Sequence, residues 1–256
     1  GGGDNAVSAI GVGAVSPGDA FISLGTSGVL FVVTDAYRPA PQSAVHAFCH
    51  VLPNLWHQMS VMLSAASCLQ WFCRLVGVTE TELLEEIAQL SDADKASAPM
   101  FLPYLSGERT PHNDPHARGL FWAPLTHSSQ RALMGYAVLE GVSFGIADGL
   151  RVLQESGTAI EQCSLVGGGA RSPFWAQLLA DILDMPVVTH KGGETGGALG
   201  AARLACLAAG KPLAAVCEKP EIFKTWRSDP ERHNALMQRY QQFTALYHND
   251  LNYRNQ

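Results

Sequence analysis

Residues 163–174 read CSLVGGGARSPF, and this stretch decides the fold that we expect. The four residues before the glycines are mostly apolar and predict a short strand. Three glycines follow, and Ser172 with Pro173 then marks the start of a helix that we extend to residue 183. A strand that passes through a glycine turn into a helix is typical of α/β proteins, in which helices cover a sheet.

The glycine turn at residues 167–169 has two interpretations. Glycines leave the backbone bare, so a flat ring or a phosphate group can lie against it at the start of a helix. The spacing is not that of a dinucleotide-binding fingerprint, because Ser172 stands where the third glycine would be. The turn can equally be a tight structural connection without a ligand, and the residues by themselves leave both interpretations open.

Upstream of this stretch, the pattern predicts two pairs of strands. Residues 20–24 and 29–33 are apolar and β-rich, and the polar turn at 25–28 between them predicts a hairpin. Residues 44–51 and 55–61 predict a second pair, joined around a proline and an asparagine. All four of these strands precede the first helix that has a clear apolar pattern.

The rest of the chain predicts helices and two further strands. We expect helices over residues 63–76, 79–90, 128–154, 173–183, 195–209 and 230–251. We expect strands over residues 100–104 and 186–190, a polar linker over 91–99 and an irregular segment over 105–126. The first of these helices is apolar nearly all round, so we expect it to be buried. Strands followed by alternating helices and strands indicate a mixed sheet flanked by helices, in one α/β domain covering residues 1–256.

Composition excludes several classes of protein. Of the 256 residues, 47% are apolar and 16% are charged, which is too apolar for a disordered chain. The 17 basic and 23 acidic side chains give a net charge of −6, which argues against a nucleic-acid partner. No apolar run approaches the roughly 18 residues of a membrane-spanning helix, so we expect no membrane partner. Six cysteines without a Cys-x-x-Cys pair predict reduced thiols in a cytoplasmic protein.

The polar turn at residues 25–28 also has two interpretations. Its glycines allow a close approach of the backbone, and successive N–H groups in such a turn can hold an anion. The hydroxyl groups of Thr26 and Ser27 would add donors to a phosphate. An ordinary hairpin turn has the same composition, and the Walker spacing with its Gly-Lys-Ser/Thr is missing.

Asp4 follows three glycines and can serve chemistry or local structure. An aspartate is a competent general base when a hydroxyl group lies within hydrogen-bonding reach. An aspartate at this kind of position more commonly caps a helix, and Asp4 with Asn5 can begin one.

Charged and histidine-rich positions give weaker signals. Residues 105–119 form a long segment dense in proline, histidine and charge, and such loops often carry function, but Glu108 and Arg109 in it can be a plain surface pair. His46 and His50 would lie about 13 Å apart on a strand, too far to share one ion. We therefore expect no structural transition metal.

Residues 192–202 are unusually rich in glycine and alanine. Small residues allow two backbone segments to approach closely. One explanation is a helix at a hinge between two lobes. The other, which we prefer, is a helix packed tightly on the sheet.

Five motifs together resemble one family. They are GGGDN at 1–5, LGTSG at 24–28, GERTP at 107–111, GGGARS at 167–172 and ALGAA at 198–202. Their order resembles the C-terminal half of the FGGY family of carbohydrate kinases. The family's fold consists of two ribonuclease H-like lobes, as in actin-like ATPases, with the active site in the cleft between them. The resemblance implies that this chain is the second, nucleotide-binding lobe.

The resemblance also assigns roles to residues. Asp4 matches the family's catalytic base, and with Asn5 it would contact the sugar. The residues that would contact the nucleotide are Gly25, Thr26 and Ser27 near the phosphates, and Ala66, Gln70, Gly168, Gly169, Ala170 and Ser172 near the adenosine. Ala66 and Ser172 depart from the family pattern, since many relatives have glycine and asparagine there.

The implied activity is transfer of the γ-phosphate of ATP, with Mg²⁺, to a terminal hydroxyl group of a sugar. Residues 43–71 and 101–122 resemble most the members that phosphorylate D-xylulose. The N-terminal sugar-binding lobe would be a partner in the same chain, so this lobe alone would be inactive, and a homodimer stays open. The alternatives are an actin-like nucleotide-binding module without phosphoryl transfer, and a kinase for ribulose, glycerol or gluconate.

Overall fold

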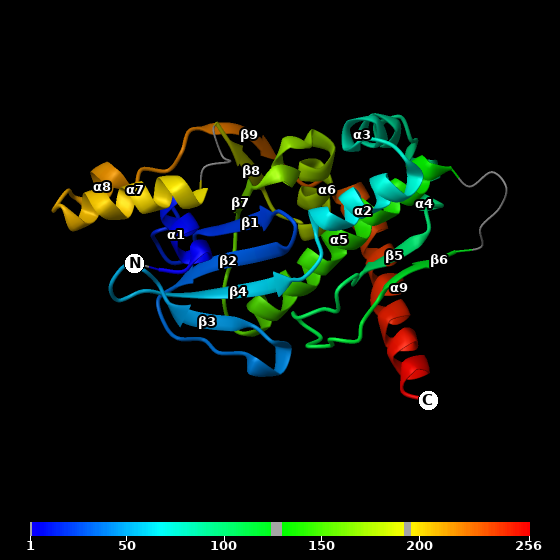
Figure 1. The fold of residues 1–256 in the computed structure, drawn as a ribbon, viewed down its shortest axis with the longest axis horizontal. Coiled ribbons are helices and arrows are strands. Elements are labelled where there is room, and N and C mark those ends of the chain that lie inside the picture. Colours follow the sequence, from blue (N-terminus) through cyan, green and yellow to red (C-terminus); the bar gives the residue numbers. More distant parts are fainter. Residues whose placement is uncertain (1, 124–129, 192–195) are drawn as a thin grey trace.

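The computed structural model describes residues 2–123, 130–191 and 196–256 (Figure 1). Its strands are β1 (Ala20–Leu24), β2 (Gly28–Thr34), β3 (His46–Cys49), β4 (Trp56–Met62), β5 (Met100–Pro103), β6 (Gly119–Trp122), β7 (Cys163–Val166), β8 (Val187–His190) and β9 (Ile222–Trp226). Its α-helices are α1 (Asp4–Gly11), α2 (Ala66–Val76), α3 (Glu80–Ala88), α4 (Asp92–Ala96), α5 (Arg131–Glu155), α6 (Pro173–Leu183), α7 (Gly196–Ala208), α8 (Leu213–Val216) and α9 (Pro230–Arg254). Two short 3₁₀ helices are η1 (Pro41–Ser43) and η2 (Gly168–Arg171).

Seven strands form one mixed sheet in the order β3-β4-β2-β1-β7-β8-β9, and β5 pairs with β6 in a small second sheet. β1 pairs antiparallel with β2, so that Ser23 lies opposite Val29. On its other side β1 pairs parallel with β7, so that Ile22 lies opposite Leu165. The predicted hairpin and the predicted strand before the glycines are therefore neighbours. The mixed sheet with its helices confirms the predicted α/β fold.

The central strands bury both of their faces. Alternate residues of a strand point to opposite faces of the sheet. Ile22 and Leu30 belong to the main core, into which α2, α5 and α6 also pack. Phe21 and Phe31 stack with their ring centroids 4.9 Å apart in a second core, where Ala9 of α1 joins them. The sheet thus separates α1 from the large helical layer.

Glycines bring α5 close to both sheets. A Cβ atom added at Gly141 would lie 2.2 Å from the carbonyl oxygen of Phe101, and one added at Gly149 would lie 2.2 Å from Ser60 Oγ. We expected no segment apolar enough over a sufficient length to cross a membrane. α5 corrects this expectation, because its length and composition would allow it to do so. Since 83% of its apolar window is buried inside the protein, α5 is the central core helix of the fold.

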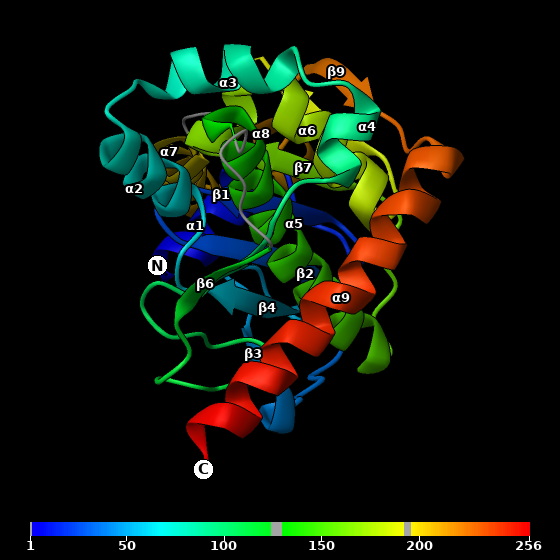
Figure 2. The same cartoon turned by 90° about the vertical axis from the view of Figure 1, so that its right-hand side faces the viewer.

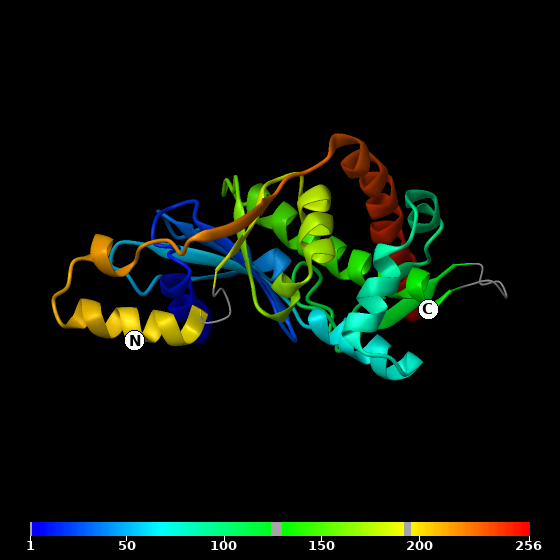
Figure 3. The same ribbon diagram turned by 90° about the horizontal axis from the view of Figure 1, so that it is seen from above.

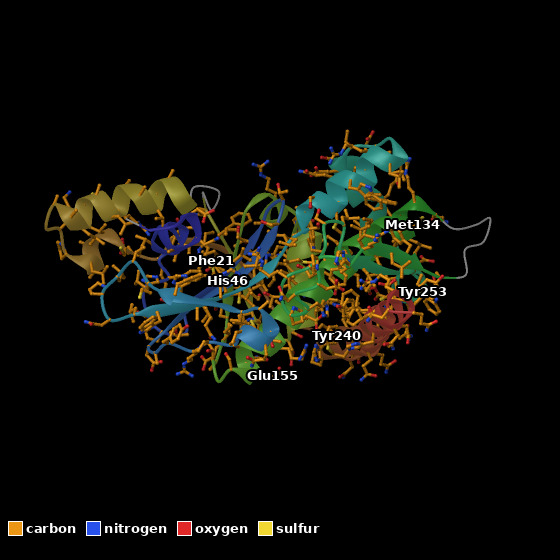
Figure 4. The ribbon with its side chains drawn as sticks, turned by 60° about the horizontal axis from the view of Figure 1, so that its bottom comes forward. Phe21, His46, Met134, Glu155, Tyr240 and Tyr253 are labelled. Carbon is orange, nitrogen blue, oxygen red and sulfur yellow. The ribbon has the colours of Figure 1, made fainter. Side chains whose placement is uncertain are left out.

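The last helix, α9, packs along α5 and α6 (Figure 2). Its apolar residues Leu236 and Phe243 are buried in the main core. The hydroxyl group of Tyr240 donates a hydrogen bond to Asp148 of α5 at 2.6 Å, and Figure 4 shows the Tyr240 side chain at the contact of the two helices. Arg239 adds an ion pair with the buried Glu140 of α5 at 2.6 Å.

The first core helix differs from its prediction. α2 begins at Ala66 rather than at residue 63. Its buried residues form one face, whereas Gln70, Arg74 and Leu75 are exposed, so the prediction of all-round burial is wrong. A helix at the edge of the main core needs only one apolar face, and the apolar Leu75 lies outside it.

Several short elements were not predicted. The supposed linker over residues 91–99 contains α4, which begins with a capping box between Ser91 and Asp94. The supposed irregular segment over 105–126 contains β6, which pairs with β5. The short helix α8 and the strand β9 were also missed. The predicted helix start at residue 128 lies outside the described residues.

The glycine- and alanine-rich helix α7 packs on another helix. Figures 1 and 3 show α7 alongside α1, at the opposite end of the molecule from α9. A Cβ atom added at Gly200 would lie 1.9 Å from the carbonyl oxygen of Val7, and one added at Gly11 would lie 1.9 Å from that of Gly196. The preference for packing on the sheet is therefore wrong. Residues 192–195 of the small-residue segment lie outside the described residues.

Candidate active site

The turn between β1 and β2 is bound directly to the start of α2. The N–H of Ala66 donates to the carbonyl oxygen of Gly25 at 2.8 Å, and the N–H of Ala65 donates to that of Thr26 at 2.9 Å. The hydroxyl group of Ser67 also donates to the Thr26 carbonyl, at 2.7 Å. α2 has no side-chain cap, so these carbonyl groups satisfy N–H groups that a helix start leaves free.

The glycine turn lies against the last residue of β1. Gly167 has a φ of +87°, and a Cβ atom there would lie 2.9 Å from the carbonyl oxygen of Leu24. A Cβ atom at Gly169 would lie 2.4 Å from Leu24 Cδ2. Glycine is required at both positions by this close approach and, at Gly167, by the positive φ. Gly168 is exposed, and a Cβ atom there would meet nothing within 4 Å.

Three predicted nucleotide-contacting segments therefore meet at one place. The turn at residues 25–27, the start of α2 and the glycine turn surround the carboxyl ends of the parallel strands β1 and β7. Thr26 and Ser27 expose their side chains there, and Gln70 is exposed one helical turn after Ala66. Ligands of α/β proteins commonly bind at the carboxyl ends of strands. The arrangement offers hydroxyl groups and bare backbone to an anionic ligand.

Ser172 has a local structural role. Its side chain is buried, and its hydroxyl oxygen accepts a hydrogen bond from the N–H of Trp175 at 3.2 Å, which caps α6. Ala170, two residues earlier, is half-buried in η2. A contact of either residue with a nucleotide stays a prediction.

Asp4 lies apart from this cluster. It is the first residue of α1, Gly3 is the N-cap, and the Asp4 side chain is exposed. Its carboxylate accepts a hydrogen bond from the N–H of Asn5 at 2.8 Å, and among the described residues it makes no hydrogen bond to either turn. Figure 1 shows α1 toward the end of β1 that is opposite α2. The role of Asp4 as a base, and that of Asn5 in sugar binding, stay predictions.

The residues of this half do not fit a protein-bound Mg²⁺ ion. Within the described ranges, no group of three or more His, Cys, Asp or Glu side chains could hold a metal ion. The exposed side chains of the turn at residues 25–27, Thr26 and Ser27, carry hydroxyl groups rather than the carboxylates that Mg²⁺ prefers. His50 makes a structural contact, because its Nδ1 accepts from the N–H of Leu52 at 3.1 Å.

Comparison with known proteins identifies the family. The pattern of the FGGY family of carbohydrate kinases, C-terminal domain, matches residues 20–209, which include both turns and α2. The chain belongs to the FGGY family of carbohydrate kinases. Xylulose kinase from Escherichia coli (strain K12) is 48% identical to this FGGY chain over 250 residues, covering 96% of this chain and 51% of the relative. Xylulose kinase from Klebsiella pneumoniae is 50% identical over 209 residues, covering 81% of this chain and 42% of the relative.

Solved structures agree with this family membership. A crystal structure described as a xyloylose kinase from Brucella ovis has a TM-score of 0.91 and 48% identity, covering 96% of this chain and 51% of the other. Xylulose kinase from Rhodospirillum rubrum has a TM-score of 0.84 and 26% identity, covering 100% and 52%. These sugar kinases have the actin-like ATPase fold, which confirms the predicted fold class. This FGGY chain spans about half the length of the curated relatives it matches.

One residue near the cluster was misjudged from sequence. Glu108 is not part of a surface pair, since it is only 2% exposed and its carboxylate accepts hydrogen bonds from the N–H groups of Leu63 and Arg109. Arg109 itself reaches toward the ring of His46, with Nη1 3.3 Å from Nε2. The only signal for Glu108 in the sequence was its place in the GERTP motif, and the motif did not predict which residues it contacts.

Proposed function

We propose that this chain is the nucleotide-binding half of a kinase that transfers the γ-phosphate of ATP to the terminal hydroxyl group of D-xylulose, forming xylulose 5-phosphate. The observation that carries the proposal is the 48% identity to Escherichia coli xylulose kinase over 96% of this chain. The cluster of turns at the carboxyl ends of β1 and β7 supports it, because it is suited to a nucleotide with its phosphates.

Different segments of the cluster would bind different parts of the nucleotide. The exposed hydroxyl groups of Thr26 and Ser27 would donate to the β- and γ-phosphates. Gly168 and Gly169 would leave room for the adenosine, with Ala170, Ala66 and Gln70 around it and Ser172 beneath. Positioning and charge stabilisation account for most of the catalysis in phosphoryl transfer, so rigid turns are what the reaction needs.

Asp4 would supply the proton acceptor. The sugar oxygen attacks the γ-phosphorus, its bond to phosphorus forms as the bond to the β-phosphate oxygen breaks, and ADP leaves with that electron pair. The hydroxyl proton passes to the Asp4 carboxylate. Since the Asp4 carboxylate makes no hydrogen bond to the turns among the described residues, the reacting groups would have to lie between α1 and the β1–β2 turn. The other half of the chain would hold the sugar there and close the site.

Sugar-dependent ADP formation by the complete chain tests the proposal. We expect ADP release to rise many-fold with D-xylulose and to stay near background without sugar. D-Ribulose, glycerol and gluconate are the matched comparison substrates. Faster turnover with one of these would keep the kinase and correct the sugar. ADP release independent of every sugar would contradict the kinase and favour the second candidate.

The second candidate is an actin-like nucleotide-binding module without phosphoryl transfer. The observation that favours it is the exposed Asp4 carboxylate, which bonds only its own neighbour among the described residues. A module that holds a nucleotide needs no carboxylate facing an acceptor hydroxyl. We propose that the protein is cytoplasmic, in keeping with its six free cysteines, and neither candidate requires a nucleic acid or a membrane. A homodimer is compatible with both.

A further inference from the structure

The GERTP motif lies against the end of β4, away from the groups assigned to catalysis. The N–H of Thr110 donates to the carbonyl oxygen of Val61 at 3.0 Å. In return, the N–H of Val61 donates to Thr110 Oγ1 at 3.0 Å, and the Thr110 hydroxyl donates to the carbonyl oxygen of Ala44 at 3.1 Å. Thr110 therefore holds both backbone polar groups of Val61.

Glu108 accepts a hydrogen bond from the backbone N–H of Leu63, two residues after Val61. Its Oε1 accepts from the N–H of Leu63 at 2.9 Å and from the N–H of Arg109 at 2.7 Å. Leu63 follows the last residue of β4, where the chain leaves the sheet. Glu108 and Thr110 thus fix residues 61–63 from outside the sheet.

Residues 61–63 lead directly into the residues that hydrogen-bond the turn at residues 25–27. Within β4, Met62 lies opposite Gly28, the residue that follows the turn. Three residues after Met62, the N–H of Ala65 donates to the carbonyl oxygen of Thr26, and that of Ala66 donates to Gly25. The turn is therefore held on its β2 side and through its own carbonyl groups by a segment that the GERTP motif anchors.

We propose that Glu108 and Thr110 are positioning residues for the phosphate-contacting turn at residues 25–27, acting through residues 61–66. This inference rests on the proposed function, because it assumes that the turn binds the phosphates. In this proposal, neither Glu108 nor Thr110 contacts the nucleotide. Their loss would let the start of α2 shift, and with it the carbonyl groups and N–H groups of the turn.

The surroundings of Glu108 decide which substitution preserves its role. Burial, with a smaller contribution from the nearby carboxylate of Asp148, raises the pKa of Glu108 to about 7. Oε2 has no hydrogen-bond partner among the described residues. A proton on Oε2 would leave Oε1 free to accept both N–H groups, and a glutamine amide places an NH₂ group and an oxygen in the same way. Cys68 and Tyr104 face the same carboxylate, and burial keeps both neutral by raising their pKa values.

The test compares four variants of the complete chain. Glu108→Ala removes the acceptor, Glu108→Gln keeps it, and Thr110→Val removes one hydroxyl group at nearly constant shape. Glu140→Gln is the matched control, because Glu140 is a fully buried carboxylate of α5 whose partners are Arg239 and Tyr136. The measurements are the Kd of ADP by calorimetry, the KM values for ATP and D-xylulose, and the thermal midpoint.

We expect Glu108→Ala to raise the Kd of ADP and the KM for ATP about tenfold, and Thr110→Val to raise them about threefold. The KM for D-xylulose should not change, and Glu108→Gln should restore ADP binding to within about twofold of the wild type. Glu140→Gln should lower the thermal midpoint without changing ADP binding. Thr110→Val carries the test if Glu108→Ala does not fold.

Two results would overturn the inference. One is unchanged ADP binding in folded Thr110→Val and Glu108→Ala chains, beside a wild type that binds ADP. The other is an equal loss of ADP binding in Glu140→Gln, which would make the effect one of general stability. Failure of the wild-type chain to bind ADP would instead contradict the proposed function, so the two failures are distinguishable.

Discussion

Asp4 and Thr26 are the side chains on which the proposed reaction depends most, and they act at different stages. Thr26 belongs to a turn whose carbonyl groups are tied to α2, so its place is set before any ligand binds. Asp4 is exposed and bonds only Asn5 among the described residues, so its partner must come with the substrate. The two residues should therefore separate kinetically, one acting on nucleotide affinity and the other on turnover.

Replacing Asp4 by alanine in the complete chain should lower kcat about 10²- to 10⁴-fold, the usual contribution of a general base. The Kd of ADP should stay within about twofold, because the carboxylate makes no hydrogen bond to the turns in the described part of the chain. A coupled assay of ADP formation and calorimetry measure the two quantities. Asp4→Asn is the control, since the amide keeps an acceptor for the Asn5 N–H but cannot take the proton. Near-normal turnover in either variant would remove Asp4 from the mechanism.

His57 is a buried imidazole in the second core. It stacks on Phe31 with the ring centroids 4.5 Å apart, and its Nδ1 has no hydrogen-bond partner among the described residues. Burial, with the nearby imidazole of His50, lowers its pKa to about 4. Because the folded pKa lies below the ordinary 6.5, the folded protein resists protonation that the unfolded chain accepts. Stability from this site is complete above pH 6.5 and is lost as the pH falls toward 4.

We therefore expect the free energy of unfolding to fall between pH 7 and pH 4.5, and His57→Phe to remove about 1–3 kcal/mol of that fall. Phenylalanine keeps the stack on Phe31 and carries no proton. Urea unfolding at several pH values measures the slope. His116→Gln, which removes an imidazole from the exposed part of the 105–119 segment, is the control. If the free energy of unfolding changes with pH equally in wild type and His57→Phe, protonation of His57 does not contribute to the loss of stability in acid.

Individual residues were predictable from sequence only where the local pattern was sufficient. Thr26 and Ser27 stand between two clear strands, so their place in an exposed turn followed directly. Glu108 is a residue type that is rarely buried, and nothing local shows that Leu63, 45 positions earlier, donates to it. A contact of this kind becomes visible only when the fold brings the two segments together.

At the scale of elements, the pairing of α1 with α7 carries the most consequence for function. Gly200 of α7 lies against the backbone of Val7, and Gly11 of α1 lies against that of Gly196. The two helices touch backbone to backbone, so the position of α1 depends on α7. Since α1 begins with Asp4, the small-residue face of α7 would set where the proposed base stands.

Gly200→Ala should push α1 away, because the new Cβ atom would lie 1.9 Å from the Val7 carbonyl oxygen. We expect a loss of about 1–3 kcal/mol in stability and a fall in kcat of about 10- to 100-fold, with ADP affinity unchanged. Gly197→Ala is the matched control on the same helix. Its Cβ atom would lie 3.5 Å from Ser8 Oγ, an ordinary contact, and alanine favours a helix. If both variants keep normal kcat, the position of α1 does not limit the reaction.

The elements predicted correctly are those whose own residues decide them. β1 and β2 are apolar and end at a polar turn, and α6 begins with a serine cap and a proline. β6 and β9 have only four and five residues, and each is a strand because a partner, β5 or β8, accepts it. Propensity over so few residues is weak beside such tertiary pairing. The same reason explains why α7 was expected on the sheet: small residues show close packing but not the partner.

At the scale of the whole molecule, the candidate site is a product of sheet order. The turn at 25–27, the start of α2 at 66 and the glycine turn at 167–169 are far apart in the chain. They meet because β1 lies between β2 and β7, with β1 and β7 parallel. The sequence predicted each strand and the β1–β2 hairpin, but it did not predict that β7 lies beside β1. Only the resemblance to a family brought the three segments together. The reverse holds for Asp4, where the resemblance gives a role and the fold gives no contact.

The chain of residues 1–256, produced alone, should form no ADP in response to D-xylulose, whereas the complete chain should. Two observations support this expectation. The chain spans about half of its curated relatives, and no metal-holding group of acidic side chains is found within the described ranges. Without the other half, nothing holds the sugar between α1 and the turn, so the proximity that drives phosphoryl transfer is lost. A coupled assay at equal molar concentrations, with a calorimetric check that each preparation unfolds cooperatively, measures the difference. Sugar-dependent turnover by residues 1–256 would mean that one lobe contains both substrate sites, which would contradict the two-lobe proposal.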